Sequence, residues 1–510
     1  MLKRLWIVLC LFTSLTAFAQ SLSESATEKS YSKAREVVDA GIKAMGGLDA
    51  LKAIENISRE MAGVRTDEGQ GPRPIPHRAD YYNTREAPVV NTPREKHVND
   101  LRGQRYSFSL DAVIFGGQPL KFRNILTKDT SIFINYDLGT VETRPLPNAA
   151  AIRVGRLTRY PETLLPIALD RYETLRYLGE SQYEGKKQQV ISFGHPNGWL
   201  ITLYFDAQTG LLTKNEVLSD HLVGGDVVDE VVYSDWRAVG KLMLPFRYVE
   251  KLGGVVLQDL RAASITVDAK LDENLFAAPE GFAQVERKPP PSFVTKLSED
   301  VYLAHGEYNS VFVVFNDYVL VLEAGFNNQA SAGVIAQIKV AAPGKPIRYL
   351  VSTHFHFDHL GGVRSYIAEG TTIVTTPSAK QVIEQAAVAA HNRRPDALSR
   401  SPRAPVIETM KDKRVFDDGV HRVELYEFSN PHCAEMIIAW LPKEKILFEA
   451  DMLDLTYPGF VGTGGEDTAA LAEKVRELGL EVERIIPVHG RMGTIDDLRK
   501  SVDRRTKANK

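Results

Sequence analysis

Three histidines and an aspartate lie within six residues in the C-terminal half of the chain. They are His354, His356, Asp358 and His359, and they directly follow the apolar segment 348–353, which is predicted to be a buried strand. Neutral imidazole and carboxylate groups are the ligands that zinc and similar borderline ions prefer. Histidines two positions apart can reach one metal ion, and the adjacent Asp358 and His359 can hold a second ion nearby. The segment therefore predicts a metal site at the end of a strand.

Three further segments downstream can each place one ligand beside a predicted strand. His432 precedes the apolar strand 436–441, the strand within 445–451 ends in Asp451, and the strand within 485–488 is followed by His489. Alone, either histidine would be interpreted as an ordinary polar residue. Together with the hexapeptide, they form four sites that follow one another along the chain, each at the end of a strand.

From residue 323 to its end, the chain resembles the metallo-β-lactamase superfamily in the order of these four sites. The resemblance implies an αββα sandwich with the site at one sheet edge. It implies one metal ion held by His354, His356 and His432. It also implies a second ion held by Asp358, His359 and His489, with Asp451 bridging the two.

The chain departs from the family pattern at three positions. Glu323 stands where the strand of the first motif usually ends in Asp. Because its side chain is longer, we expect it to shift slightly the position of the metal loop, the segment 354–359 that carries the predicted ligands. Asp451 stands where β-lactamases with a thiolate ligand have Cys, and a bridging aspartate is more typical of the thioesterases, lactonases and phosphodiesterases of the superfamily. Cys433 follows His432 in place of the usual threonine, and we interpret it as a packing residue.

Such a pair of ions implies hydrolysis by a metal-bound hydroxide, because bound metal lowers the pKa of water to about 7. Asp358 or Asp451 is expected to be catalytic by orienting this water or carrying its proton. We predict a metal-dependent hydrolase with two Zn²⁺ ions, with iron or manganese as other possible metals. The expected substrate is a small molecule of the ester, lactone, thioester or β-lactam type.

Two other functions stay open at this point. An iron-dependent dioxygenase could use the same fold, although it would need fewer ligands than the seven found. A non-enzymatic envelope ligand-binding protein could hold a structural metal, although a closed structural site normally has four ligands.

The N-terminal half predicts a separate domain that is rich in strands. Three consecutive prolines, Pro289–Pro291, favour an extended spacer. We therefore predict a domain over 20–286, a linker over 287–292 and the hydrolase domain over 293–510. The first domain begins with a helix over 30–45, continues with alternating segments typical of a curved antiparallel sheet, and carries a helical stretch over 149–177. The fold class is thus a two-domain protein that combines α+β and α/β units.

The segments 44–51, 204–212 and 271–276 loosely resemble the half-barrel domains of lipoprotein-carrier type. This resemblance implies a concave face that accepts an apolar ligand; a structural or substrate-delivery module is the alternative. No catalytic constellation occurs here, and the scattered histidines are interpreted as ordinary polar residues: His77, His97, His195 and His221.

The first nineteen residues have the pattern of a cleaved signal peptide. Lys3 and Arg4 precede an apolar run that is much shorter than the ~20 residues needed to cross a bilayer, and Ala17-Phe18-Ala19 forms a cleavage site before Gln20. We expect a periplasmic or secreted protein with no stable membrane span. Cys433 is then the one remaining cysteine, which excludes an internal disulfide.

Charge and composition exclude a nucleic-acid partner, because the formal net charge is −3. The sequence predicts no oligomeric state. The insert between the second and third motifs contains His391, Arg393 and Arg394. It could contact an anionic substrate, although a solvated surface is the simpler interpretation.

Overall fold

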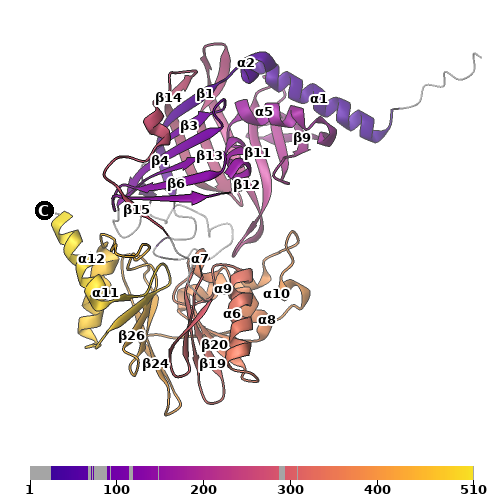
Figure 1. The fold of residues 1–510 in the computed structure, drawn as a ribbon. Helices are drawn as coiled ribbons and strands as arrows, with labels where there is room; N and C mark the ends of the chain where they lie inside the picture. Colours follow the sequence, from indigo (N-terminus) through magenta and orange to yellow (C-terminus); the bar gives the residue numbers. More distant parts are fainter. Residues whose placement is uncertain are drawn as a thin grey trace, which may run out of the picture.

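The structure is a computed structural model that describes residues 24–66, 71, 73, 89–91, 93–113, 119–146, 149–286, 293–306 and 308–508. The predicted signal peptide, the predicted linker over 287–292 and His77 lie outside these residues. Within the described part of the chain, no helix is long and apolar enough to cross a membrane. A large sheet formed by the N-terminal half lies above a C-terminal unit with two smaller sheets (Figure 1).

The N-terminal half is dominated by one sheet of fifteen strands. The strands are β1 (Asn56–Thr66), β2 (Val89–Asn91), β3 (Arg94–Asp100), β4 (Arg105–Val113), β5 (Pro119–Leu126), β6 (Thr130–Asn135), β7 (Thr140–Pro145), β8 (Arg176–Tyr183), β9 (Lys186–Gly194), β10 (Leu200–Asp206), β11 (Leu212–His221), β12 (Gly225–Val239), β13 (Leu242–Leu252), β14 (Val255–Val267) and β15 (Ala283–Val285). Their order is β15-β7-β6-β5-β4-β3-β1-β14-β13-β12-β11-β10-β9-β8, with β2 paired to β1. Neighbours are antiparallel except β15 and β7.

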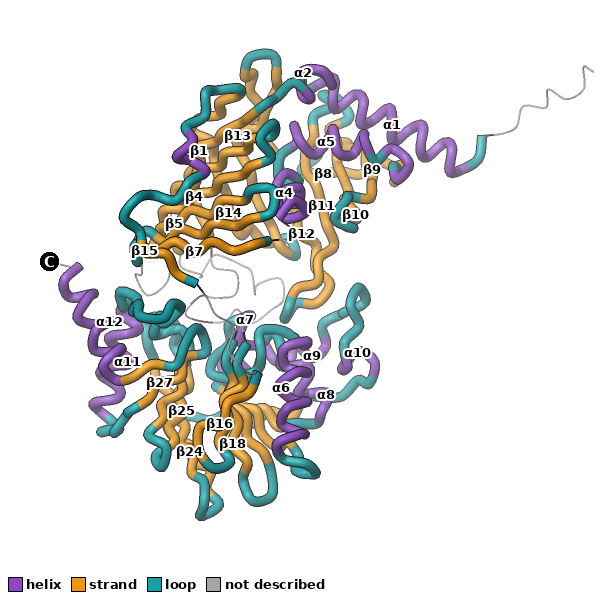
Figure 2. The backbone as a smooth tube through the Cα atoms, in the orientation of Figure 1, coloured by secondary structure: helices purple, strands orange, loops and turns teal. Residues whose placement is uncertain are grey.

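Among the described residues of this half, four α-helices and two short 3₁₀ turns accompany the sheet (Figure 2). They are α1 (Ala26–Ala44), α2 (Leu48–Lys52), α4 (Ala149–Leu157), α5 (Pro161–Asp170), η2 (Tyr172–Thr174) and η3 (Glu273–Phe276). Helix α1 begins with a capping box in which Ser25 accepts a hydrogen bond from the Glu28 amide. Its apolar face and that of α5 pack on the sheet in one core cluster.

The predicted helical stretch over 149–177 is wrong as a single element. The chain leaves the helix after α4, and Tyr160 is extended (φ −122°, ψ 121°) immediately before Pro161. Proline disfavours helical backbone in the residue before it and has no N–H to donate, so a new helix starts at Pro161. The stretch ends as strand, because Arg176 and Tyr177 already belong to β8.

The C-terminal half contains two sheets with helices on their outer sides (Figures 1 and 2). The first sheet runs in chain order through β16 (Val294–Ser298), β17 (Val301–Ala304), β18 (Ser310–Val314), β19 (Val319–Leu322), β20 (Ile347–Val351), β21 (Thr372–Thr375) and β22 (Val406–Thr409). The second runs through β23 (Lys413–Asp417), β24 (Arg422–Phe428), β25 (Met436–Leu441), β26 (Ile446–Glu449), β27 (Arg484–Pro487) and β28 (Gly493–Thr494).

The helices of this half are α6 (Asn328–Ala341), α7 (Phe357–Leu360), α8 (Val363–Glu369), α9 (Pro377–Val388), α10 (Ala397–Arg400), α11 (Glu466–Glu477) and α12 (Ile495–Ala508). Helices α6, α8 and α9 lie beside the first sheet, and α11 and α12 lie beside the second (Figure 1). Buried strands such as β18, β19 and β25 are continuous apolar runs because both of their faces are covered.

The apolar core of the C-terminal half also includes residues of the N-terminal half. Val223, Val227 and Leu252 belong to the same buried cluster as the strands of both C-terminal sheets. Val223 lies in the turn between β11 and β12, which reaches the C-terminal half (Figure 1). The β11–β12 hairpin therefore joins the two halves through a shared core.

Candidate metal centre

Four loops bring the seven predicted ligands to one edge of the C-terminal sheets. His354, His356, Asp358 and His359 follow β20, where the chain turns into α7. The remaining three lie in the turn before β25, two residues after β26 and two residues after β27: His432, Asp451 and His489. Strands β19 to β21 are parallel, as are β26 and β27. Parallel strands end at the same sheet edge, so residues distant in sequence meet there.

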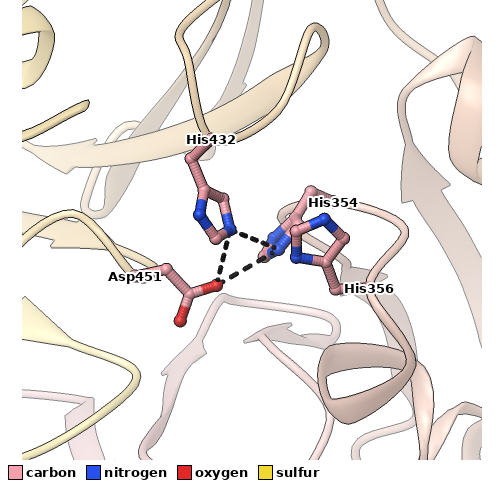
Figure 3. A group of neighbouring side chains, drawn as sticks. All are labelled: His354, His356, His432 and Asp451. Carbon is pink, nitrogen blue, oxygen red and sulfur yellow. Dashed lines mark hydrogen bonds and ion pairs between the residues drawn. The ribbon is translucent and has the colours of Figure 1, made fainter. Parts of the chain in front are cut away.

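The first group consists of His354, His356, His432 and Asp451, whose ligand atoms all lie within 4.8 Å of one another (Figure 3). Asp451 Oδ2 lies 3.2 Å from His354 Nε2 and 3.1 Å from His432 Nε2. The two imidazole nitrogens are 3.4 Å apart. All three histidines are buried.

The second group consists of Asp358, His359 and His489, whose ligand atoms also lie within 4.8 Å of one another. His359 Nε2 lies 3.3 Å from His489 Nε2 and 3.7 Å from Asp358 Oδ2. The His489 side chain is 34% exposed, whereas that of His359 is fully buried. Solvent therefore reaches the centre on the side of His489.

Asp451, a member of the first group, also contacts the second group. Its Oδ2 contacts His354 and His432 and also lies 2.9 Å from His359 Nε2, while its Oδ1 lies 2.7 Å from His489 Nε2. Its backbone is left-handed (φ 64°), a conformation that costs a non-glycine residue free energy and that clusters at functional sites. This backbone turn places the carboxylate between the two groups of histidines.

These distances suit tetrahedral zinc. Ligand atoms at ~2.0–2.1 Å from one tetrahedral ion are separated by about 3.3–3.4 Å. The pairs His354–His432 and His359–His489 have nitrogen separations of 3.4 Å and 3.3 Å. The donor set of imidazoles and carboxylates therefore fits a pair of divalent ions.

The pKa shifts of His354, His356 and Asp451 also favour the binding of a metal cation. Burial and the neighbouring histidines hold the pKa of His354 well below its ordinary value, and burial with His432 lowers the pKa of His356 to about 3. Both rings are therefore neutral, as ligands must be. Burial alone would raise the pKa of Asp451, but His359 and His489 hold it well below its ordinary value. The centre thus combines two neutral imidazoles with an ionised carboxylate. In contrast, burial alone would lower the pKa of His359, but the carboxylates of Asp451 and Asp358 hold it well above its ordinary value, so this ring must release a proton when it binds a metal ion.

Glu323 supports the metal loop despite its extra methylene. Its Oε2 accepts a hydrogen bond from Thr353 Oγ1 at 2.5 Å and lies 3.3 Å from His359 Nδ1. Thr353 Oγ1 also lies 3.0 Å from His354 Nδ1. The side chain is fully buried and its backbone is left-handed (φ 71°). The Glu323 carboxylate thus orients the His359 ring directly and the His354 ring through Thr353. These contacts fix which ring nitrogens face the centre.

One contact to the centre comes from the N-terminal half. The Gly71 carbonyl oxygen lies 3.0 Å from His356 Nε2. Donation of this N–H leaves the other ring nitrogen, Nδ1, with its lone pair for a metal ion. The centre therefore lies where the two halves meet, in agreement with the position of α7 in Figure 1.

The sequence analysis missed Tyr308, which lies between β17 and β18. Its hydroxyl donates a hydrogen bond to Asp358 Oδ2 at 2.9 Å, and its ring packs edge-on against His489 with centroids 4.3 Å apart. The ring also stacks on Phe326 at 4.9 Å. No local motif marks this tyrosine, because its partner is fifty residues away in sequence.

Cys433 lies beside the centre but is not among its grouped ligand atoms. The thiol is buried and donates a hydrogen bond to the Glu435 carbonyl oxygen at 3.1 Å. Burial raises its pKa to about 12, so the thiol stays protonated. The side chain fills space, in keeping with the interpretation of Cys433 as a packing residue.

The fold and the site define a class: a domain of two facing sheets with a histidine- and aspartate-rich centre at the strand ends. The sequence model of the metallo-beta-lactamase superfamily matches residues 305–489. These residues form a domain of that superfamily, and the N-terminal sheet lies outside the match.

Solved structures of metallo-beta-lactamases also match the chain. A metallo-beta-lactamase from Pontibacter korlensis is 21% identical, and the match covers 42% of this chain and 98% of that one with a TM-score of 0.33. One from Hirschia baltica is 17% identical, and the match covers 42% of this chain and 96% of that one with a TM-score of 0.32. Family membership of the domain rests on the sequence match and the ligand geometry.

Proposed function

We propose that the C-terminal domain is a hydrolase that uses two zinc ions. The observation that carries this proposal is the position of Asp451, whose two carboxylate oxygens contact histidines of both ligand groups. A structural zinc site is normally closed by four ligands around one ion. Seven converging ligands with an exposed side at His489 favour a catalytic pair.

When bound, the metal pair supplies an activated water at neutral pH and polarises the substrate carbonyl. The residues of the chain divide the remaining tasks. The buried histidines and Glu323 keep the centre rigid, and Tyr308 holds one oxygen of Asp358. Asp358 and Asp451 are the carboxylates that can hold a proton during the reaction. The open side near His489 admits the substrate.

The proposed substrates are small esters, lactones, thioesters and β-lactams. A carboxylate at position 451 in place of a thiolate favours the first three. Hydrolysis of one chromogenic representative of each class by the zinc-loaded protein would rank them. All four reactions begin with attack on a carbonyl carbon. Differences in their rates therefore report which leaving group the site prefers.

Metal content is the decisive measurement. We expect about two zinc ions per native chain and at most one in Asp451→Ala, with hydrolysis reduced about 100-fold or more because the shared ligand is lost. Asp454→Ala is the matched control, since Asp454 lies on the same loop but is exposed and outside both groups. A single iron ion would favour oxygen-dependent chemistry instead. No stoichiometric metal in the native protein would contradict the proposal.

We also propose that the chain is exported to the periplasm or outside the cell. The support is the positive and apolar pattern of residues 1–19 with its cleavage site before Gln20. N-terminal sequencing of the protein recovered from the periplasmic or culture fraction should start at Gln20. Recovery of an uncleaved chain from the cytoplasm would contradict export.

A further inference from the structure

A large cavity lies at the junction of the two halves, apart from the metal ligands. Its volume is about 760 Å³, and its walls come from α4, from the strands β10 to β13 and from the insert before α10. None of the seven metal ligands lines it. Strands of the N-terminal sheet thus form one wall, and Arg393 and Arg394 of the C-terminal half form another.

The wall from the N-terminal sheet is partly apolar. Ile201 and Val231 are buried beneath the cavity, and Val217 lies beside them. Trp199 lines the cavity with 38% of its surface exposed. An exposed tryptophan in a concave wall favours contact with an apolar group. The cavity therefore offers an apolar surface to a ligand.

The charges around this surface are unbalanced. Asp220 lies 3.2 Å from His391 Nδ1, and Glu250 forms an ion pair with Arg159. Asp229 also has a partner. In contrast, no carboxylate among the described residues pairs with three exposed arginine side chains that line the cavity: Arg156, Arg393 and Arg394. These guanidinium groups can form paired hydrogen bonds with a carboxylate or phosphate.

The two arginines of the C-terminal half are held at the cavity by the N-terminal half. Asp226 Oδ2 accepts a hydrogen bond from the Asn392 amide at 2.8 Å, and Oδ1 accepts one from the Arg393 amide at 3.3 Å. The Asp226 amide donates to the Ala390 carbonyl oxygen at 2.6 Å. The backbone next to the arginines is therefore fixed before any ligand binds, which lowers the entropy cost of binding.

We propose that this cavity binds an amphipathic anion, with its apolar body against Trp199 and Val217 and its anionic group at Arg393 and Arg394. The site differs from the metal centre, and binding there needs no hydrolysis. It also refines the expectation of an apolar ligand, because the cationic wall selects for a carboxylate or phosphate. Since both halves contribute to the walls, a bound ligand would contact both.

The test uses the full chain and three probes that separate the two features of the ligand. Decanoate has both the anion and the apolar body, decan-1-ol has only the apolar body, and inorganic phosphate has only the anion. Binding is measured by titration calorimetry and by tryptophan emission. We expect saturable binding of about one decanoate per chain, with decan-1-ol and phosphate about tenfold weaker or more. Trp199→Phe should remove the emission change.

Charge reversal at the cavity provides the second arm. The double variant Arg393→Glu/Arg394→Glu should weaken decanoate binding about tenfold or more because it repels the carboxylate. The matched control is Arg499→Glu/Lys500→Glu, an adjacent exposed basic pair on α12 with the same change of charge. The control should bind decanoate like the native chain.

Four results would overturn the proposal: no saturable decanoate binding, equal binding of decan-1-ol and decanoate, equal binding of phosphate and decanoate, or equal weakening by the control variant. The last would show that net charge, and not this cavity, attracts the anion. Equal binding of phosphate and decanoate would identify a simple anion site that does not recognise the apolar chain. None of these outcomes depends on metal content or hydrolysis.

Discussion

At the scale of single residues, the centre depends on side chains that hold the ligands as much as on the ligands themselves. Glu323 and Asp451 both have left-handed backbones at the ends of strands, where a non-glycine residue costs free energy. In both cases the carboxylate reaches histidines that a regular strand end would leave apart. The strain is consistent with geometry selected for the site.

Tyr308 offers a test at this scale. Tyr308→Phe keeps the ring against His489 but removes the hydroxyl that donates to Asp358. Loss of a hydrogen bond to a ligand typically weakens metal binding about 10–100-fold. Competition with a chromophoric chelator should show this loss for one of two zinc ions.

The control for this measurement is Tyr302→Phe. Tyr302 lies on the neighbouring strand β17 and stacks on Phe312, away from the ligands. It should leave both zinc affinities unchanged. Equal zinc affinities in Tyr308→Phe and the native protein would mean that Asp358 needs no support from this tyrosine.

At the scale of secondary-structure elements, Arg364 ties α8 to the elements that follow the metal loop. Its buried guanidinium donates two hydrogen bonds to Asp396, at the start of α10, and one to the Ala386 carbonyl oxygen in α9. Since α8 directly follows the metal loop, this contact fixes the end of that loop.

Asp396→Asn should destabilise the folded chain by about 3–5 kcal/mol, because it leaves a buried guanidinium without its counter-charge. The denaturant midpoint of unfolding measures this change. Asp417→Asn is the control, since the pair of Asp417 and Arg422 is exposed; it should leave the denaturant midpoint nearly unchanged. Equal effects of the two substitutions would contradict the assigned role of burial.

The same pair predicts a dependence on pH. Burial alone would raise the pKa of Asp396, but Arg364 and Ser399 hold it well below its ordinary value. The stabilisation is therefore complete above pH ~4, the ordinary aspartate value, and is lost as the pH falls through the lower folded value. The stability difference between the native chain and Asp396→Asn should shrink on acidification. A difference that stays constant from neutral pH to pH ~3 would contradict the shift.

At the scale of the whole molecule, the β11–β12 hairpin makes the two halves interdependent. Val223 and Val227 are buried among residues of the C-terminal half, and the His221 ring lies 5.6 Å from that of Phe357 in the metal loop. A shared core couples the unfolding of its parts. We therefore expect one calorimetric transition for the native chain.

Val223→Asp should separate this unfolding into two transitions, because it places a charge in the shared core. Leu218→Asp is the control, since Leu218 lies on the same hairpin but is 46% exposed; it should keep the single transition. Two transitions already present in the native chain would show that the hairpin does not couple the halves.

Local patterns were sufficient to predict which seven histidine and aspartate side chains converge at the strand ends. The reason is that the ends of parallel strands share an edge, so a histidine that follows one such strand meets those that follow the others. The break at Pro161 is also encoded in the sequence, because a proline disfavours helical backbone in the residue before it, but the prediction of one helical stretch over 149–177 did not include it.

The sequence by itself determined which groups could bind metal, because residue type and spacing set the ligand chemistry. Only the tertiary structure decided what surrounds them. Tyr308 and the Gly71 carbonyl lie 50 and 285 residues from their partners, and Arg393 reaches the cavity through Asp226 of the other half. Such pairings depend on the packing of whole sheets and domains, and no local sequence pattern encodes that packing.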